Sequence, residues 1–479
     1  MDWRNAIFIK FNLGSPAKKI IIDTTGILIA PDFKAFLKQK GIVSSQPSNL
    51  NQILSQVNDN TVRLILYTRS DIPSYLHRRA DIYHFKYSDL PFNIDPNLFA
   101  QLEFHEIIAL CNYLSACNNP HQVVTKNNLS ELLSSAQNHN RIDEIKLLTN
   151  QIDLILSKKA DYNKIIEIGA MWGKLIYTSY RLKQERPLET ENRIDQYVLD
   201  YLLSGELKNI WYTAPNDVKS TDRIIRFLQN QNIAKFALIC FDGMGAAEWQ
   251  LLQEHLKPDR FKYHENYIYA LIPTTTVISR SALFSGSHDS VYQTKYVNEI
   301  KEFKKKFPGH DHKHFRGKDP ISSDGLLGIT AVTMLFNFFD DLSHATHFPP
   351  GIDSKALYFD TVKNYLNNMR LGDTLNLLLN EGLRVFVCSD HGCAVAVGNG
   401  KKIDKWLQDK FTRRGCLVDE SSLLEFYDYP QYKVPFVKNK IVVFPENRMM
   451  FATAGKVAIT HGGVTVDELI VPFAEIKKL

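Results

Sequence analysis

The stretch KFALICFDGMG at 235–245 decides the fold prediction for the second half of this chain. Six apolar residues in a row end on Asp242, and the two glycines of DGMG permit a tight turn directly after it. A short apolar run closed by a turn is typical of a buried strand in a parallel sheet. Open α/β sheets place their active sites at the carboxyl ends of such strands. Asp242 is therefore a candidate site residue, with an ordinary turn aspartate as the alternative.

Two further apolar runs end on residues that can bind metal ions. RVFVCS at 384–389 is followed by Asp390 and His391 in the tripeptide DHG, and KVAIT at 456–460 is followed by His461 in HGG. An adjacent carboxylate and imidazole can reach one cation from a bend after a strand. A single histidine is more often a core or surface residue, so it is the joint occurrence of these motifs that favours a site.

A fourth segment, FNFFDDLSHATH at 336–347, places Asp340 and His344 four residues apart. That spacing puts both side chains on one face of a helix, within reach of a shared metal ion. Two cations about 4 Å apart can hold the attacking and leaving oxygens of a phosphoryl transfer. Carboxylate and imidazole donors suit zinc, and manganese accepts the same donors. The ligand set therefore predicts two divalent metal ions, with zinc favoured.

A run of threonines supplies the candidate nucleophile. YIYALIP at 267–273 leads into Thr274, Thr275 and Thr276, and VISRSALFSG at 277–286 has the pattern of a helix that begins beside them. A helix N-terminus favours bound phosphate. A metal ion can activate a threonine hydroxyl for nucleophilic attack. The residues alone leave the choice among the three threonines open, and a threonine N-cap is the alternative to a nucleophile.

The rest of the chain divides by pattern. KKIIID at 18–23 is a strand candidate, and the DTTG motif that follows its last apolar residue is interpreted as a structural turn. Between 96 and 230 apolar residues recur three and four apart, as in helices. We therefore expect an α/β protein with a small α/β segment over 1–95, a helical segment over 96–230 and an α/β domain over 231–479.

Composition places the chain among globular proteins. Of its 479 residues 44% are hydrophobic and 23% are charged, and the net charge of +5 is too small to identify a ligand. The six cysteines form no CxxC pair, as a reducing compartment permits. No apolar run approaches the roughly 18 residues of a membrane span, and the first residues lack the pattern of a signal peptide. These features predict a cytoplasmic location.

The motifs together resemble a known family. Over about 235–475, the chain is similar to the alkaline phosphatase superfamily, and more closely to its PglZ branch. The motifs that carry the resemblance are, in chain order, FALICFDGMG, LIPTTTVISRSALFSG, FFDDLSHATH, VFVCSDHG and THGGVTVDELIVPF. The resemblance to PglZ rests chiefly on PTTTVISRSALFSG, DDLSH and HGGVTVDELIVP. It implies an alkaline-phosphatase-like central sheet flanked by helices in the C-terminal domain.

The resemblance also implies a role for each site residue. Asp242, Thr276, Asp390 and His391 would gather around one metal ion, and Asp340, His344 and His461 around the other. Thr276 would be the nucleophile, because the family pattern places the hydroxyl three residues after the proline, here Pro273. Arg280, four residues later, would help to hold phosphate, with an ordinary surface arginine as the alternative.

Proteins with PglZ domains look like phosphodiesterases or nuclease-type hydrolases, some attached to response regulators and others in phage-exclusion (BREX-type) systems. The segment 1–95 lacks the early acidic pair and later lysine of a receiver, which favours phage defence, or a stand-alone relative, over attachment to a response regulator. The implied activity is a two-metal phosphodiesterase acting on nucleic acid or oligonucleotides. The implied partners are this phosphodiester substrate and other defence proteins, and no membrane.

Substrate choice is expected to depend on two inserted segments, 287–335 and 398–455, which are long enough to form a cap over the site. Two alternatives remain open. One is a phosphomonoesterase or phosphomutase acting on a small metabolite, and a closed polar pocket would favour this alternative. The other is a scaffold in a defence complex whose metal ions only stabilise the fold.

Overall fold

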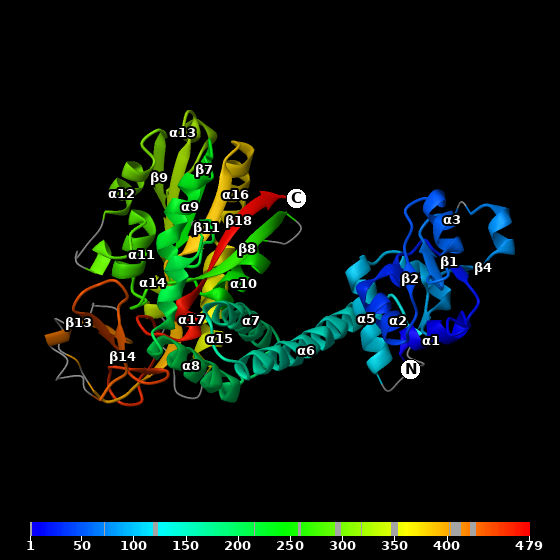
Figure 1. Cartoon of the computed structure of the whole chain (residues 1–479), viewed down its shortest axis with the longest axis horizontal. Coiled ribbons are helices and arrows are strands. Elements are labelled where there is room, and N and C mark those ends of the chain that lie inside the picture. The colour runs from blue at the N-terminus through cyan, green and yellow to red at the C-terminus, as the bar shows by residue number, and fades with distance from the viewer. Residues whose placement is uncertain are drawn as a thin grey trace. The chain divides into compact units, whose positions relative to one another are not determined.

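The computed structural model divides the chain into two compact units, Met1–Glu144 and Ile145–Leu479, which we call unit 1 and unit 2 (Figure 1). The structure describes residues 2–70, 72–117, 123–214, 216–256, 260–292, 298–317, 319–345, 353–401, 403, 413–421 and 428–479. Nowhere in these ranges is a helix both long enough and apolar enough to cross a membrane.

Unit 1 contains a parallel four-stranded sheet in the order β2-β3-β1-β4. Its strands are β1 (Lys19–Asp23), β2 (Ser44–Ser45), β3 (Leu64–Tyr67) and β4 (Asp81–Phe85), and its longer helices are α1 (Trp3–Lys10), α2 (Pro31–Gln39), α3 (Leu50–Asn58) and α5 (Phe104–Ala116). Buried Asp23 ends β1, and its carboxylate accepts hydrogen bonds from the backbone N–H groups of Thr25, Gly26 and Leu28. The DTTG motif is thus a structural turn, as predicted.

Helices dominate the stretch after unit 1's sheet. They are α6 (Leu129–Leu156), α7 (Tyr162–Arg181), α8 (Leu188–Leu203) and α9 (Ile224–Asn230). The division between the two units falls inside α6, so the helices expected over 96–230 are shared between the units. The three-part division of the chain stays a prediction.

Unit 2 is built on a six-stranded sheet in the order β8-β18-β11-β7-β10-β9. The strands are β7 (Phe236–Phe241), β8 (Phe261–Tyr269), β9 (His312–Arg316), β10 (Ala331–Phe336), β11 (Arg384–Ser389) and β18 (Ile470–Lys478). β9, β10, β7 and β11 are parallel, and β18 runs antiparallel between β11 and β8. Because β18 is antiparallel to both of its neighbours, β8 runs in the same direction as β9, β10, β7 and β11. The carboxyl ends of these five strands therefore lie at one edge of the sheet.

Helices cover both faces of this sheet (Figure 1). Along β7, Ala237, Ile239 and Phe241 join the core shared with α7, α10 (Ala246–His255), α15 (Ser354–Asn367) and α16 (Leu371–Asn380). The alternate residues Phe236 and Leu238 join a second core with α9, α11 (Thr276–Ser285) and α12 (Glu299–Lys306). A strand buried on both faces requires a continuous apolar run, which FALICF supplies. Unit 2 is therefore an α/β fold, as predicted.

One predicted cap segment is wrong in part. Within 287–335, β9 and β10 belong to the central sheet, because β10 pairs with β7 along its whole length. The other segment, 398–455, contributes small separate sheets: β13 (Cys416–Asp419), β14 (Gln431–Lys433) and β15 (Lys440–Val443) form one, and β16 (Met449–Met450) pairs with β12 (Ala394–Gly398), which pairs with β17 (Val457–Thr460). Whether 398–455 forms a cap stays a prediction.

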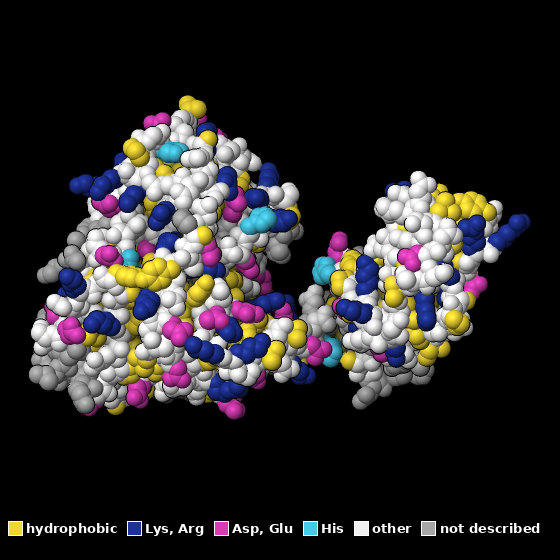
Figure 2. All heavy atoms as spheres, viewed as in Figure 1, with side chains coloured by type: hydrophobic (Ala, Val, Ile, Leu, Met, Phe, Trp, Pro, Cys, Tyr) yellow, Lys and Arg dark blue, Asp and Glu magenta, His cyan; other side chains and the backbone are white. Residues whose placement is uncertain are grey.

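Charged side chains are mixed on the surface of unit 2. On the face shown in Figure 2, lysine and arginine side chains alternate with aspartate and glutamate. This mixing agrees with the small net charge of the chain.

Candidate metal centre

Most of the predicted ligands come from the edge of the central sheet where its parallel strands end, and His461 follows β17 of a separate small sheet. Asp242 follows β7, Asp390 and His391 follow β11, and Asp340 lies in α14 (Phe338–Ala345), which follows β10. Asp242 can turn away from β7 because Gly243 adopts a left-handed conformation (φ 75°), and a side chain there would press on Asp340. The glycine thus brings the two carboxylate-bearing segments close together.

The first ligand group consists of Asp242, Asp390 and His391, and all three are buried. One ligand atom from each lies within 4.8 Å of the others. Asp242 Oδ1 is 3.4 Å from His391 Nε2. Burial and the neighbouring carboxylate of Asp390 raise the pKa of Asp242 to about 6. Such mutual repulsion between buried carboxylates is what a bound cation relieves.

The second ligand group consists of Asp340, His344 and His461. Asp340 Oδ1 lies 3.3 Å from His344 Nε2 and 3.3 Å from His461 Nε2. Burial opposes ionisation of Asp340, but the imidazoles of His344, His461 and His391 lower its pKa. The spacing of four residues places Asp340 and His344 on one face of α14, as predicted from the sequence.

The two ligand groups adjoin each other. The rings of His391 and His461 stack with their centroids 4.1 Å apart and an interplanar angle of 18°. Each ring is oriented through its other nitrogen, because His391 Nδ1 lies 3.0 Å from the carbonyl of Gly392 and His461 Nδ1 lies 3.0 Å from the carbonyl of Thr274. This leaves both Nε2 atoms directed at the ligand groups, as in histidines that bind metal ions.

The residues fit divalent metal ions. The buried His461 Nε2 and Asp340 Oδ1 atoms face each other at 3.3 Å, but neither atom makes a hydrogen bond of good geometry with a described residue. Buried polar atoms are rarely left without a hydrogen bond, and a bound cation would satisfy both atoms of this pair. Three carboxylates and three imidazoles in two groups form a donor set that suits zinc and is accepted by manganese.

The three threonines have different positions. Thr274 is fully buried, and its hydroxyl donates to the carbonyl of Gly463 at 2.8 Å and accepts from the N–H of Gly462 at 3.0 Å. Thr275 is the N-cap of α11. Of the three hydroxyl groups, that of Thr276 lies beside the first ligand group, 3.3 Å from Asp242 Oδ1 and 3.0 Å from His391 Nε2. The geometry therefore places Thr276, among the three, next to the candidate metal ligands.

Replacing Thr274 by valine should weaken zinc binding by about 10–100-fold, because the segment that carries His461 loses its support. The change leaves the N–H of Gly462 and the carbonyl of Gly463 without their buried partner. Zinc affinity can be measured by competition with a chromophoric chelator. Thr274→Ser keeps the hydroxyl and should bind zinc almost as the unchanged protein does; equal affinity of the valine variant would contradict this supporting role.

Arg280 is not a surface residue, so that alternative is wrong. It is 7% exposed, forms an ion pair with Asp242, and its Nε lies 3.0 Å from Asp390 Oδ2. Both carboxylates belong to the first ligand group. Its predicted contact with phosphate stays a prediction.

Sequence reasoning missed the residues that hold the HGG loop. Fully buried Glu468 accepts from the N–H of Gly463 at 2.7 Å and from the hydroxyl of Thr465 at 2.6 Å, and it pairs with Arg414 at 2.9 Å. Arg414 also donates to the carbonyl of Met449. The capping-box pattern TVDE at 465–468 was a signal for Glu468. Arg414 lies 54 positions away and gave no such signal.

A second missed pair lies behind the ligand groups. Buried Lys355 Nζ is 2.5 Å from Glu248 Oε1 and 3.3 Å from the carbonyl of Cys393, two residues after His391. On the same helix, the hydroxyl of Tyr358 donates to the carbonyl of Phe339, next to Asp340. Helix α15 thus contacts two segments, each of which carries two ligands of one group.

No family model matches the chain, and no curated protein matches it. Solved structures are similar to it. Murine ectonucleotide pyrophosphatase/phosphodiesterase 5 is 13% identical over 50% of this chain and 87% of that chain, with a TM-score of 0.31. The phosphonoacetate hydrolase from Sinorhizobium meliloti 1021, in complex with phosphonoacetate, is 12% identical over 50% of this chain and 89% of that chain, with a TM-score of 0.30. Similarity at this level assigns no activity to this chain.

Proposed function

We propose that unit 2 is a metal-dependent phosphoester hydrolase in which Thr276 is the nucleophile. The observation that carries the proposal is the position of the Thr276 hydroxyl, which lies 3.0 Å from His391 Nε2 and 3.3 Å from Asp242 Oδ1, beside a second group of ligands. A hydroxyl placed among metal ligands is the arrangement that activates a weak nucleophile.

Each ligand group would hold one divalent cation, with zinc preferred and manganese accepted. When bound, such cations neutralise phosphoryl oxygens and lower the pKa of a coordinated hydroxyl. The sets that would hold them are Asp242, Asp390 and His391 with the Thr276 hydroxyl, and Asp340, His344 and His461.

The chain's own residues would position the ester. Thr276 is the first residue of α11, so the free N–H groups and dipole of that helix favour a phosphate beside its hydroxyl. The Thr276 oxygen would form a bond to phosphorus while the bond from phosphorus to the leaving oxygen breaks. Water would then hydrolyse the phosphothreonine and release the second product.

The ion pairs that Arg280 forms favour a phosphodiester substrate over a phosphomonoester. Its guanidinium contacts both Asp242 and Asp390, so its charge is largely balanced before substrate arrives. A phosphodiester carries one negative charge, and it needs less additional positive charge than a phosphomonoester dianion. We therefore infer that the substrate is a phosphodiester. Nucleic acid or oligonucleotides as substrate, defence proteins as partners, membership of the PglZ branch and a role in phage defence rest on the sequence resemblance alone and stay predictions.

Turnover of model esters tests this proposal. With added zinc or manganese, the protein should hydrolyse bis-p-nitrophenyl phosphate faster than p-nitrophenyl phosphate, as measured by release of p-nitrophenolate. Removal of metal with a chelator should abolish this turnover, and either cation should restore it. Preference for the monoester would instead favour a phosphatase. No turnover of either ester by protein shown to bind metal would overturn the proposal and favour a scaffold.

A further inference from the structure

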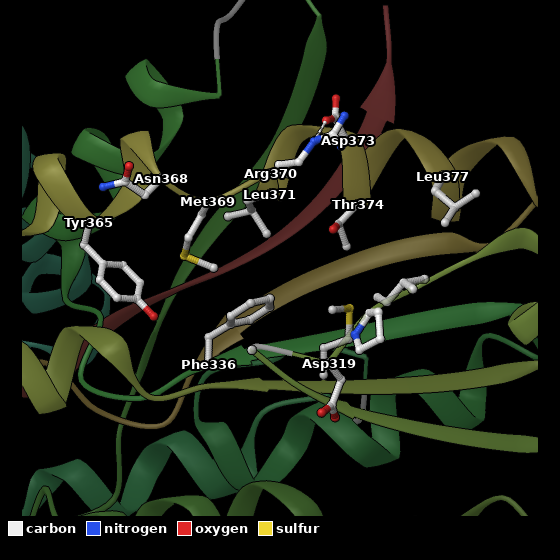
Figure 3. Close-up of a pocket in the computed structure, with 14 residues that line it drawn as sticks. Asp319, Phe336, Tyr365, Asn368, Met369, Arg370, Leu371, Asp373, Thr374 and Leu377 are labelled. Atoms are coloured by element: carbon white, nitrogen blue, oxygen red, sulfur yellow. Dashed lines mark hydrogen bonds and ion pairs between the residues drawn. The ribbon is translucent and has the colours of Figure 1, made fainter.

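A cavity of about 720 Å³ lies between the central sheet and the junction of α15 and α16. Figure 3 shows Tyr365, Met369 and Thr374 on the helical side, across the cavity from Phe336 on the sheet side. Its size falls in the range of small-molecule sites, roughly 300–1,000 Å³.

A smaller hollow of about 270 Å³ adjoins this cavity. The two share Gly317, Phe336 and Tyr365. The smaller hollow also reaches Arg280, whose guanidinium contacts Asp242 and Asp390 of the first ligand group. The two hollows therefore form one cleft that begins at the carboxyl ends of β9 and β10 and ends against α16, where open α/β sheets bind ligands.

The cleft is aromatic where the two hollows meet, and the lining of the larger cavity is mainly apolar. Tyr365 stacks on Phe338 with the ring centroids 5.0 Å apart and an interplanar angle of 22°. Met334 and Met369 add thioethers, which make favourable contacts with aromatic rings. A planar aromatic group could therefore pack against an aromatic and sulfur-rich wall.

The charged residues at the far end are turned away or already bonded. Arg370 and Asp373 pair with each other at 2.8 Å, with side chains 88% and 56% exposed, and Figure 3 shows the pair on the side of α16 away from the cavity. The carboxylate of Asp319 accepts from the N–H of Arg316 at 2.6 Å. The α16 end thus suits the uncharged part of a ligand, and the anionic part would lie at the metal ions of the ligand groups.

We propose that this cleft is the subsite for the organic group of the ester, and that this group is a planar aromatic ring system. The inference rests on the proposed function, because it takes the phosphoryl group to lie at the ligand groups beside Arg280. A single-stranded polymer would instead require an open basic groove with stacked bases. The cavity instead lies between the sheet and two helices, and most of the side chains that line it are apolar.

Calorimetric titration of the Thr276→Val protein in zinc tests the subsite without requiring turnover. Thr374→Trp, added to this background, fills the cavity and should weaken binding of diphenyl phosphate by about tenfold or more, while dimethyl phosphate binds as before. Asn376→Trp is the matched control, because Asn376 is half-buried on the same helix but does not line the cavity, and it should change neither affinity. Tyr365→Ala, which adds no volume, should weaken binding of diphenyl phosphate by about fivefold.

Two further ligands identify the source of the aromatic group. If Thr374→Trp weakens binding of dithymidine monophosphate as much as binding of diphenyl phosphate, a nucleoside is supported as the natural occupant. If the affinity for dithymidine monophosphate does not change, a simpler aryl group is supported. Diphenyl phosphate binding that is unchanged by both Thr374→Trp and Tyr365→Ala would overturn the subsite. A single-stranded oligonucleotide that binds far more tightly, regardless of either variant, would also overturn it. If the subsite is overturned but the protein hydrolyses esters in a metal-dependent manner, the proposed function still holds. If the binding changes occur as expected but neither ester is hydrolysed, only the subsite is supported.

Discussion

Replacing Thr276 by valine is expected to lower the rate of bis-p-nitrophenyl phosphate hydrolysis by about 10³-fold or more. Valine has nearly the shape of threonine but lacks the oxygen that lies beside Asp242 and His391. The side chain is partly exposed at the first turn of α11, so the substitution should not disturb packing. The rate is measured by p-nitrophenolate release in zinc, and circular dichroism checks the fold.

Two control variants separate chemistry from structure. Thr276→Ser keeps a hydroxyl at the same position and should retain turnover within about tenfold of the unchanged protein. Thr275→Ala removes the N-cap of α11, which should cost about 1 kcal/mol of stability and leave the nucleophile in place. Full turnover by Thr276→Val would show that another group attacks phosphorus.

Replacing Glu468 by glutamine is expected to lower the free energy of unfolding of unit 2 by about 3 kcal/mol or more. Arg414, 1% exposed, would keep its charge without the carboxylate that balances it. Burial alone would raise the pKa of Glu468, but Arg414 and the hydrogen bonds from Thr465 and Gly463 lower it below its usual value. The stabilisation is therefore full above the unfolded pKa of about 4.3 and is lost as the pH falls through the lower folded value.

Urea denaturation followed by circular dichroism measures this loss. Asp373→Asn removes a charge from the exposed pair with Arg370, and it should change stability by less than about 1 kcal/mol. Arg414→Met combined with Glu468→Gln removes both buried charges and should recover part of the loss. A loss no larger for Glu468→Gln than for Asp373→Asn would contradict the role of this buried pair.

Much of the α/β framework of unit 2 was readable from the sequence. The runs FALICF and RVFVCS became the neighbouring strands β7 and β11, because a strand covered on both faces must be apolar throughout. The spacing in FFDDLSH correctly placed Asp340 and His344 on one helix. The grouping of the seven predicted residues was implied by the family resemblance, and their roles at metal ions stay predictions. Strand ends alone could not give it, because His461 follows β17 of a separate small sheet.

Other features depended on contacts between distant residues. β9 is an edge strand with the sequence HKHFR. Its side chains are mostly polar, so its sequence cannot be distinguished from that of a loop. β10, AVTMLF, did carry an apolar run and was missed because it lies inside a segment interpreted as an insertion. Arg448 pairs with Asp195, 253 positions away, and with Asp467. Ion pairs that join such distant positions leave no local pattern, so only the folded chain reveals them.

The contact between the 398–455 segment and the HGG loop limits how this chain can be recombined with a relative. Any side chain at Gly415 would collide with the carbonyl of Gly462, and Arg414 is bound to Glu468 on the other side of the loop. A chimera that imports 398–455 must therefore bring arginine and glycine at 414 and 415, or exchange HGGVTVDEL at 461–469 with it. The segment and the loop therefore have to be exchanged together.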